Sequence, residues 1–306
     1  MEWEKGDHMR IGPVLLSLLL LAGSVELAGC GRGAERGEAG PRVLPMRAPA
    51  AHRFGTRAHF DTGVLRMRLA GIQPRWPGPR LPVAPPPRQV DCERLKCVAL
   101  TFDDGPGEQT DKVLDTLAAH HARATFFMLG EMITDGTREF VRRMVSEGHE
   151  LGNHSWDHAS LAGLSPEALK RELGRTQDIV RQVAGVRMSV MRPPYGATNH
   201  EVAAVTKQEG LAQILWAVDT LDWRDRNAAI VAKRCGDAKP GDIVLMHDIH
   251  PTTVQALPHL LDALDHKGFT YVTVSELLGR LVPGKEYLSH PPTDRGLQAK
   301  EARPGS

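Results

Sequence analysis

The sequence predicts an α/β fold in which a parallel sheet, covered by helices, forms a closed or nearly closed barrel. Short apolar runs of strand length alternate with helical patterns from about residue 97 to residue 280. Such alternation is typical of a parallel sheet, because a crossover helix commonly joins each pair of parallel strands. About seven or eight strand-and-helix units follow one another, which favours a barrel.

The expected strands are short apolar runs that end in turn residues or polar side chains. The first run, 98–102, ends in the turn signal Asp-Asp-Gly-Pro. The other expected strands cover 124–129, 150–152, 189–192, 213–217, 243–247 and 270–274.

The expected helices lie between these strands. Ser165 followed by Pro166 is typical of a helix start, and the helix that it begins is expected to run to about Ala184. The other expected helices cover 110–121, 138–147, 201–209, 227–234 and 253–267.

Composition is typical of a soluble globular protein with an apolar core. Of the 306 residues, 41% are hydrophobic and 25% are charged. The formal net charge is +1, whereas nucleic-acid binders usually carry a basic excess or stripe. We therefore expect no nucleic-acid partner, and we expect a monomer.

The first 30 residues are expected to form an export signal that ends in a lipoprotein cleavage box. The apolar run 11–22 follows Arg10 and is too short to span a bilayer comfortably. The segment before Met9 carries three acidic residues, so translation from Met9 is an alternative to Met1. Leu-Ala-Gly-Cys at 27–30 resembles the box in which the cysteine, here Cys30, is lipidated. A plain secretory signal with an incidental cysteine is the alternative.

Three further segments follow the export signal. Residues 31–92 are rich in Pro, Gly, Ala and Arg, and we interpret them as a tether between the membrane and the folded part. The folded domain is expected over 93–282. The polar residues 283–306 are expected to form a loose tail.

Three cysteines lie outside the export signal. Cys92 and Cys97 flank the start of the first strand and are close enough in sequence to pair, which would leave Cys235 over. Export favours disulfides because the compartment is oxidising. The spacing alone does not fix the connectivity.

Polar residues follow the expected strands at the same position in each unit. In a β/α barrel the carboxyl ends of the strands share one face, where active sites are built, so these residues are expected to converge there. Each residue also has a purely structural interpretation, such as a simple turn, a surface loop or a polar side chain with its hydrogen bonds satisfied. The shared position favours a site. The residues are Asp103, Asp104, His154, His158, Arg192, Asp219, Asp222 and His247.

An aspartate combined with His154 and His158 is a suitable set of ligands for catalytic zinc. Three protein ligands leave one tetrahedral position for water. Zn2+ is therefore the expected cofactor, although Co2+ or Ni2+ can replace it in such a nitrogen and oxygen site.

Five segments in this order resemble the motifs of the polysaccharide deacetylases, also called the NodB-homology domain or carbohydrate esterase family 4. They are TFDDGP at 101–106, HSWDH at 154–158, RPPYG at 192–196, DTLDW at 219–223 and LMH at 245–247. The resemblance covers about 97–280 and shows no substitution at a catalytic position. It implies a distorted (β/α)7 barrel of the NodB-like type.

The resemblance also implies roles for matching residues in proton transfer. Asp103 is expected to be the general base, oriented by Arg192. His247 is expected to be the general acid, held and tuned by Asp222.

Metal and substrate binding are implied in the same way. Asp104 is expected to complete the metal site with the two histidines, His154 and His158. The backbone N–H of Tyr195 is expected to hold the oxyanion. Trp223 and Leu245 are expected to line the pocket for the acetyl methyl group.

The implied function is metal-dependent removal of acetyl groups from N-acetylglucosamine residues of an extracellular polysaccharide, either peptidoglycan or a chitin-like glycan. An O-deacetylase of the acetylxylan esterase type is one alternative. An inactive glycan-binding lipoprotein is another, although the intact ligands and base argue against it. The expected location is the cell membrane, through a lipid anchor and facing the wall, or outside the cell after secretion.

The sequence leaves open the roles of three polar residues near the motifs. His149, Asp248 and His250 either support the site or lie in the core or at the rim.

Overall fold

The computed structural model describes residues 81–290, in which the strands form a curled, parallel sheet with helices around it. This α/β architecture is a half-barrel consistent with the expected NodB-like distorted (β/α)7 barrel. The predicted export signal, Cys30 and most of the predicted tether lie outside the described residues.

Within residues 81–290 nine strands make up the sheet, in the spatial order β6-β7-β1-β2-β3-β4-β5-β9, with β8 also pairing β1. Every ladder between named strands is parallel. The strands are β1 (Lys96–Asp103), β2 (Thr125–Met128), β3 (Glu150–Asn153), β4 (Val190–Met191), β5 (Ala212–Ile214), β6 (Val218–Asp219), β7 (Ile243–His247), β8 (Phe269–Tyr271) and β9 (Glu286–Tyr287).

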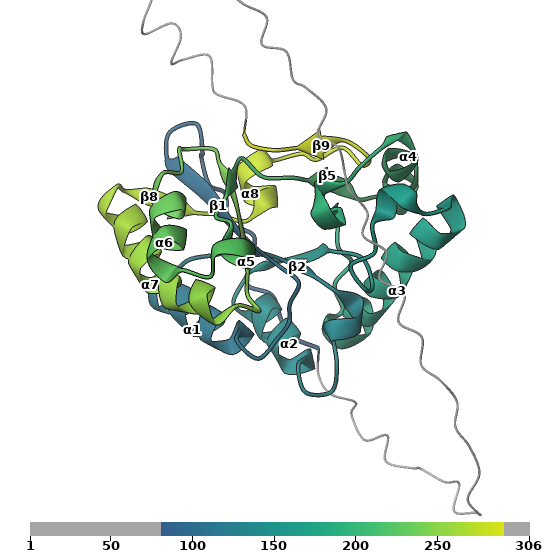
Figure 1. The fold of residues 1–306 in the computed structure, drawn as a ribbon, viewed down its shortest axis with the longest axis horizontal. Helices are drawn as coiled ribbons and strands as arrows, with labels where there is room; N and C mark the ends of the chain where they lie inside the picture. The colour runs from purple at the N-terminus through teal and green to yellow at the C-terminus, as the bar shows by residue number, and fades with distance from the viewer. Residues whose placement is uncertain (1–80, 291–306) are drawn as a thin grey trace, which may run out of the picture. The chain divides into compact units, whose positions relative to one another are not determined.

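Helices lie around the outside of the sheet, as Figure 1 shows for α1, α2, α3, α6 and α7. Within residues 81–290, none of the helices combines the length and apolarity needed to cross a bilayer. The helices are α1 (Thr110–Ala119), α2 (Arg138–Ser146), α3 (Pro166–Ala184), α4 (His200–Glu209), α5 (Asp222–Asp225), α6 (Ala228–Gly236), α7 (Pro251–His266) and α8 (Val274–Leu278).

The boundaries of α3 follow from its end residues. The Ser165 side chain accepts a hydrogen bond from Ala168 N, and Pro166 occupies the first turn, where its missing N–H costs nothing. Gly185 ends the helix with φ 72°, in the left-handed region that glycine adopts without strain. The predicted span of this helix is confirmed.

Strand β1 carries two faces with different tasks. Val98, Leu100 and Phe102 belong to the largest apolar cluster, together with leucines of α1 and α7. Because side chains alternate along a strand, Thr101 and Asp103 point to the opposite face, inside the barrel. One face of β1 therefore packs in the apolar core, and the other face carries polar side chains that point toward the site.

Between β5 and β6 the chain passes from one end of the sheet to the other. Strand β5 is bordered by β9, and Leu215 N donates to Tyr287 O at 2.7 Å. Two residues later, Ala217 N donates to Ile243 O of β7 at 3.0 Å. The run 213–217, which we expected to form one strand, is therefore split into β5 and β6, and these two strands lie in different parts of the sheet.

The C-terminal part of the domain differs from expectation at two points. We expected a strand to Val274 and a loose tail after Val282. Strand β8 instead ends at Tyr271, because Thr273 and Glu276 form a capping box that starts α8. Residues of the expected tail form β9 and pair with β5, so at least this part of it is ordered.

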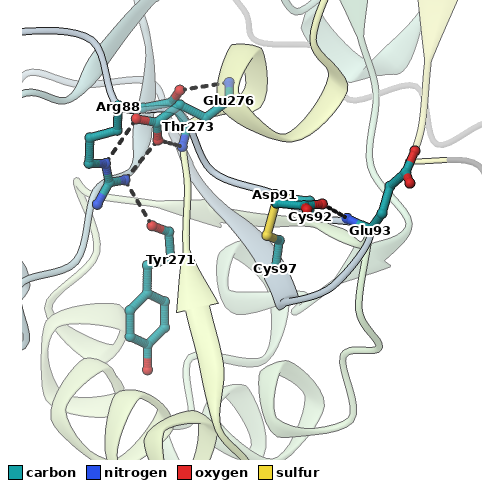
Figure 2. The surroundings of a disulfide bond; sticks show 8 residues. All are labelled: Arg88, Asp91, Cys92, Glu93, Cys97, Tyr271, Thr273 and Glu276. Carbon is teal, nitrogen blue, oxygen red and sulfur yellow. Dashed lines mark hydrogen bonds and ion pairs between the residues drawn. A yellow bond between two sulfur atoms is a disulfide. The ribbon is translucent and has the colours of Figure 1, made fainter.

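The segment before β1 contacts the body of the domain (Figure 2). Arg88 donates to both carboxylate oxygens of Glu276, at 2.9 and 2.7 Å, and to Tyr271 O at 3.0 Å. Cys92 forms a disulfide with Cys97, which is one of the pairings that the sequence allowed. The C-terminal end of the expected tether therefore lies against the domain.

Candidate active site

A cavity of about 400 Å³ opens at the carboxyl ends of the strands. It brings together residues from the ends of β1, β3, β4, β6 and β7, which are far apart in the sequence. Its lining consists of Asp103, Asp104, His154, His158, Pro193, Tyr195, Trp216, Asp219, Trp223, Leu245 and His247.

Three of these residues form a set of potential metal ligands. The ligand atoms of Asp104, His154 and His158 lie within 4.8 Å of one another. Nε2 of His154 and Nε2 of His158 lie 3.4 and 3.5 Å from Asp104 Oδ1. That oxygen is buried and accepts no hydrogen bond within residues 81–290. Two imidazole nitrogens beside a buried, unpartnered carboxylate oxygen fit a divalent metal ion such as zinc.

His154 is held in the form that a metal needs. Its Nδ1 lies 2.7 Å from the carbonyl oxygen of Arg192. Because a carbonyl only accepts, Nδ1 must carry the proton and Nε2 keeps its lone pair. Burial lowers the pKa of His154 to about 3, so the imidazole is neutral.

The loop that carries both histidines is ordered by two side chains that sequence reasoning missed. Asn153 Oδ1 accepts from Ser155 N at 2.9 Å, and its Nδ2 donates to Leu173 O at 2.9 Å. Ser155 Oγ accepts from His158 N at 3.0 Å. Ser155 and His158 have φ of 71° and 63°, which costs roughly 1–3 kcal/mol each and requires such support. An asparagine directly before the histidine motif and a serine inside it are the signal that could have identified them.

Arg192 is fully buried and holds Asp103 in place. Its Nη1 donates to Asp103 Oδ1 at 2.8 Å and to Thr101 Oγ1 at 2.7 Å. Its other nitrogens donate to the carbonyl oxygens of Ile214 at 3.0 Å and Leu215 at 3.1 Å. A buried guanidinium with this many partners is a fixed positive charge beneath the cavity.

The second oxygen of Asp103 faces the potential metal ligands. Asp103 Oδ2 lies 3.6 Å from His154 Nε2. Burial raises the pKa of Asp103, while the charge of Arg192 opposes that rise. One oxygen is therefore occupied by Arg192, and the other can accept a proton from a group beside the metal ligands.

His247 lies across the cavity and is bound to Asp222. Asp222 accepts from both the backbone N–H and Nδ1 of His247, each at 2.8 Å. Burial lowers the pKa of His247, but the hydrogen bond and charge of Asp222 outweigh it and raise the pKa to about 9. His247 is consequently protonated at neutral pH and can donate a proton from Nε2.

Thr253 is a further partner of this pair that sequence reasoning missed. Its hydroxyl donates to Asp222 Oδ2 at 2.6 Å, and Thr253 is fully buried. Together with the bonds from His247, it favours the charged carboxylate, and the pKa of Asp222 is lowered despite its burial.

Aromatic and aliphatic side chains complete the lining. The Tyr195 ring meets the His158 ring edge-on, with 4.5 Å between centroids, and Tyr195 is 70% exposed. Trp223 is 46% exposed, while Leu245 is buried. Trp216 was missed, although it stands within the expected strand 213–217 beside the motif residues.

The three polar residues left open by the sequence have different surroundings. His149 lies away from the cavity, where its Nδ1 accepts from Ala124 N at 3.1 Å. The His250 ring packs beside that of His247, with 5.5 Å between centroids. Asp248 is buried behind the loop that follows β1 and bonds to Thr110.

Known proteins resemble this chain in sequence and in structure. The polysaccharide deacetylase family matches residues 91–214. The peptidoglycan-N-acetylglucosamine deacetylase PgdA of Listeria monocytogenes is 46% identical over 249 residues, which are 80% of this chain and 51% of that protein. The chitooligosaccharide deacetylase of Bradyrhizobium is 36% identical over 58% of this chain and 89% of that one.

A solved structure of a family 4 acetyl xylan esterase from Clostridium thermocellum, in complex with a cobalt ion, has the same fold. Its TM-score is 0.60 at 32% identity, over 64% of this chain and 99% of that one. The present chain spans about half the length of the Listeria enzymes that it matches.

Proposed function

The chain belongs to the polysaccharide deacetylase family, and from that premise we propose that it removes acetyl groups from N-acetylglucosamine residues of peptidoglycan. The observation that carries the proposal is that one cavity is lined by a buried carboxylate, Asp103, a protonated imidazole, His247, and three potential metal ligands. The Listeria relative, which is named for this substrate, supports the choice of glycan.

We propose that Asp104, His154 and His158 hold a zinc ion. The donor set and the unpartnered oxygen of Asp104 support this. When bound, a zinc ion lowers the pKa of a coordinated water and polarises a carbonyl oxygen. The Clostridium esterase is in complex with a cobalt ion, which supports a metal ion in this fold, and the identity of the ion in this chain is part of the proposal.

In the proposed reaction Asp103 is the base. Arg192 fixes one of its oxygens, so the free oxygen accepts a proton from the attacking water as a bond forms to the acetyl carbon. The backbone N–H of Tyr195 is proposed to stabilise the oxygen that becomes negatively charged. Leu245 and Trp223 are proposed to receive the acetyl methyl group, because both line the cavity.

His247 is the proposed acid. As the carbon–nitrogen bond breaks, its Nε2 gives a proton to the nitrogen, which leaves as the free sugar amine. Asp222 holds the ring by Nδ1 and stabilises its charge until that step. Acetate and a deacetylated glucosamine residue are the products.

We propose that the protein is exported and held at the membrane through Cys30, with the residues between Cys30 and Arg88 as the tether of a deacetylase domain that extends through β9. The Leu-Ala-Gly-Cys box after an apolar run supports the anchor. A deacetylase on such a tether would face the cell wall, where a peptidoglycan substrate lies.

A side-by-side assay of acetate release from peptidoglycan, chitooligosaccharide and acetylated xylan tests the proposal. We expect the highest kcat/KM with peptidoglycan and loss of activity after chelation. Preference for acetylated xylan would support an O-deacetylase, which the Clostridium relative makes the second candidate. The absence of acetate release from all three glycans would refute a deacetylase.

A further inference from the structure

Asp248 directly follows the proposed acid, yet it does not line the cavity. It is fully buried, and its Oδ2 accepts from the hydroxyl of Thr110 at 2.5 Å. Its Oδ1 is buried as well and has no hydrogen-bond partner within residues 81–290. A buried carboxylate with an unpartnered oxygen is costly and calls for an explanation.

The Thr110 hydroxyl joins Asp248 to the loop that follows β1. Gly107 N donates to Thr110 Oγ1 at 2.8 Å, and Thr110 N donates to Gly107 O at 3.1 Å. A hydroxyl has a single proton. Because Thr110 donates that proton to Asp248, the lone pairs of its oxygen are left to receive Gly107 N–H. Asp248 thus orients the Thr110 hydroxyl, which in turn bonds to the loop at Gly107.

The same loop passes directly over the carboxylate. A Cβ atom on Gly105 would lie 2.3 Å from each oxygen of Asp248, so a side chain at this position would displace the carboxylate. Gly105 O accepts from Leu129 N at 3.0 Å. Residues 105–107 are consequently fixed by the end of β2, the start of α1 and the residue after β7.

The residue that needs this support is Asp104. Its φ is 71°, in the left-handed region, which costs a non-glycine residue roughly 1–3 kcal/mol and persists only where the surroundings enforce it. Asp104 immediately precedes the fixed segment 105–107. The support therefore acts on the backbone that aims Oδ1 at His154 and His158.

We propose that Asp248 and Thr110 are positioning residues for the metal site: their hydrogen bond holds residues 104–107 in the conformation in which Asp104 binds the metal ion. This inference rests on the proposed function. It extends the site to a pair of residues 138 positions apart. Within residues 81–290, neither side chain forms a hydrogen bond or ion pair with Asp104, His154 or His158.

Thr253 provides a matched control on the other side of His247. It also donates its hydroxyl to a buried aspartate, but that aspartate is Asp222, the partner of the acid. Substitution of either threonine by valine removes one buried hydrogen bond of the same kind. Only the substitution of Thr110 is expected to act on the metal ligands.

The experiment measures the zinc dissociation constant of the full chain by competition with a chromogenic chelator. We expect Thr110→Val to weaken zinc binding roughly 10-fold, in the range typical of residues that support metal ligands. Thr110→Ser keeps the hydroxyl and is expected to bind zinc within about threefold of the unsubstituted protein. Thr253→Val is expected to leave zinc affinity unchanged and to shift the alkaline limb of the pH–rate profile instead.

Equal zinc affinity of Thr110→Val and the unsubstituted protein would overturn the inference. So would equal weakening by Thr110→Val and Thr110→Ser, since the hydroxyl would then be irrelevant. If Thr110→Val does not fold, Asp248→Ala removes the same bond. Zinc affinity of Asp248→Ala equal to that of the unsubstituted protein would then overturn the inference. Absence of zinc binding in the unsubstituted protein is a separate result, which refutes the proposed metal site itself.

Discussion

Asp222 Oδ1 and His247 Nδ1 lie 2.8 Å apart, and the carboxylate raises the pKa of the imidazole well above that of a free histidine. Burial by itself would favour the neutral ring. The two residues stand 25 positions apart, at the start of α5 and the end of β7. Their contact decides whether the cavity contains a proton donor at neutral pH.

Substitution of this partner is expected to move the alkaline limb of the pH–rate profile. The acid must be protonated, so activity falls as pH rises through the pKa of His247, about 9. In Asp222→Asn the raising charge is lost while burial stays, and the limb should move down toward or below about 6.5. Acetate release measured from pH 5 to 10 tests this, and an unmoved limb would exclude His247 as the acid.

The same shift predicts a pH dependence of stability. Because the folded-state pKa of His247 is raised, its contribution is fully present below about 6.5, the unfolded value, and is lost as pH rises toward about 9. Urea unfolding of the unsubstituted protein and Asp222→Asn should therefore differ more at pH 6 than at pH 9.5. A difference that grows with pH would have the wrong sign for this interaction.

Asp103→Asn is expected to abolish most turnover and to leave zinc binding intact. The amide keeps one acceptor for Arg192 but cannot take a proton from water, so kcat should fall about 10²–10⁴-fold. Asp104→Asn is the matched control, since it should weaken zinc binding. The measurements are kcat and the zinc dissociation constant, and near-normal kcat in Asp103→Asn would contradict the assigned base.

Arg192→Gln is expected to destabilise the fold as well as the reaction. Its loss leaves Asp103 as an unpaired buried charge and frees two backbone carbonyls, so we expect a loss of about 3–5 kcal/mol in unfolding free energy. Arg181→Gln, whose ion pair with Asp178 is exposed, serves as the control and should change little. Equal effects of the two substitutions on urea unfolding would show that burial of Arg192 does not matter.

Removal of the disulfide is expected to affect stability without affecting the metal site. The bond closes a short loop of five positions, and its loss in Cys92→Ala/Cys97→Ala should cost about 2 kcal/mol. Cys97 is the second residue of β1, whereas Asp104 follows the other end of that strand. Zinc affinity should therefore stay unchanged, and a large loss of affinity would mean that the two ends of β1 are coupled.

Much of the fold and site could be predicted because both depend on local patterns. Polar residues at the carboxyl ends of the strands mark the functional face of a parallel barrel. This holds whichever residues connect one strand to the next. Ser165 and Pro166 start α3 by interactions within four residues of each other. Such signals are readable without knowledge of the rest of the chain.

The remainder depends on contacts that no local pattern reveals. Strand β9 is two residues long and is defined by pairing with β5, more than 70 positions earlier. Thr110 bonds to Asp248, and Thr253 bonds to Asp222. Each bond joins a threonine to a carboxylate that is distant in the sequence, and nothing local distinguishes these threonines from the others. The carbonyl partners of Arg192 likewise follow from the path of the chain between β5 and β6.

The most direct test of the account is the rate of acetate release from peptidoglycan as zinc is added to metal-free protein. The account predicts no release without zinc and a rise that saturates at one ion per chain, the capacity of the set Asp104, His154 and His158. Metal-free protein that releases acetate at the saturated rate would contradict it.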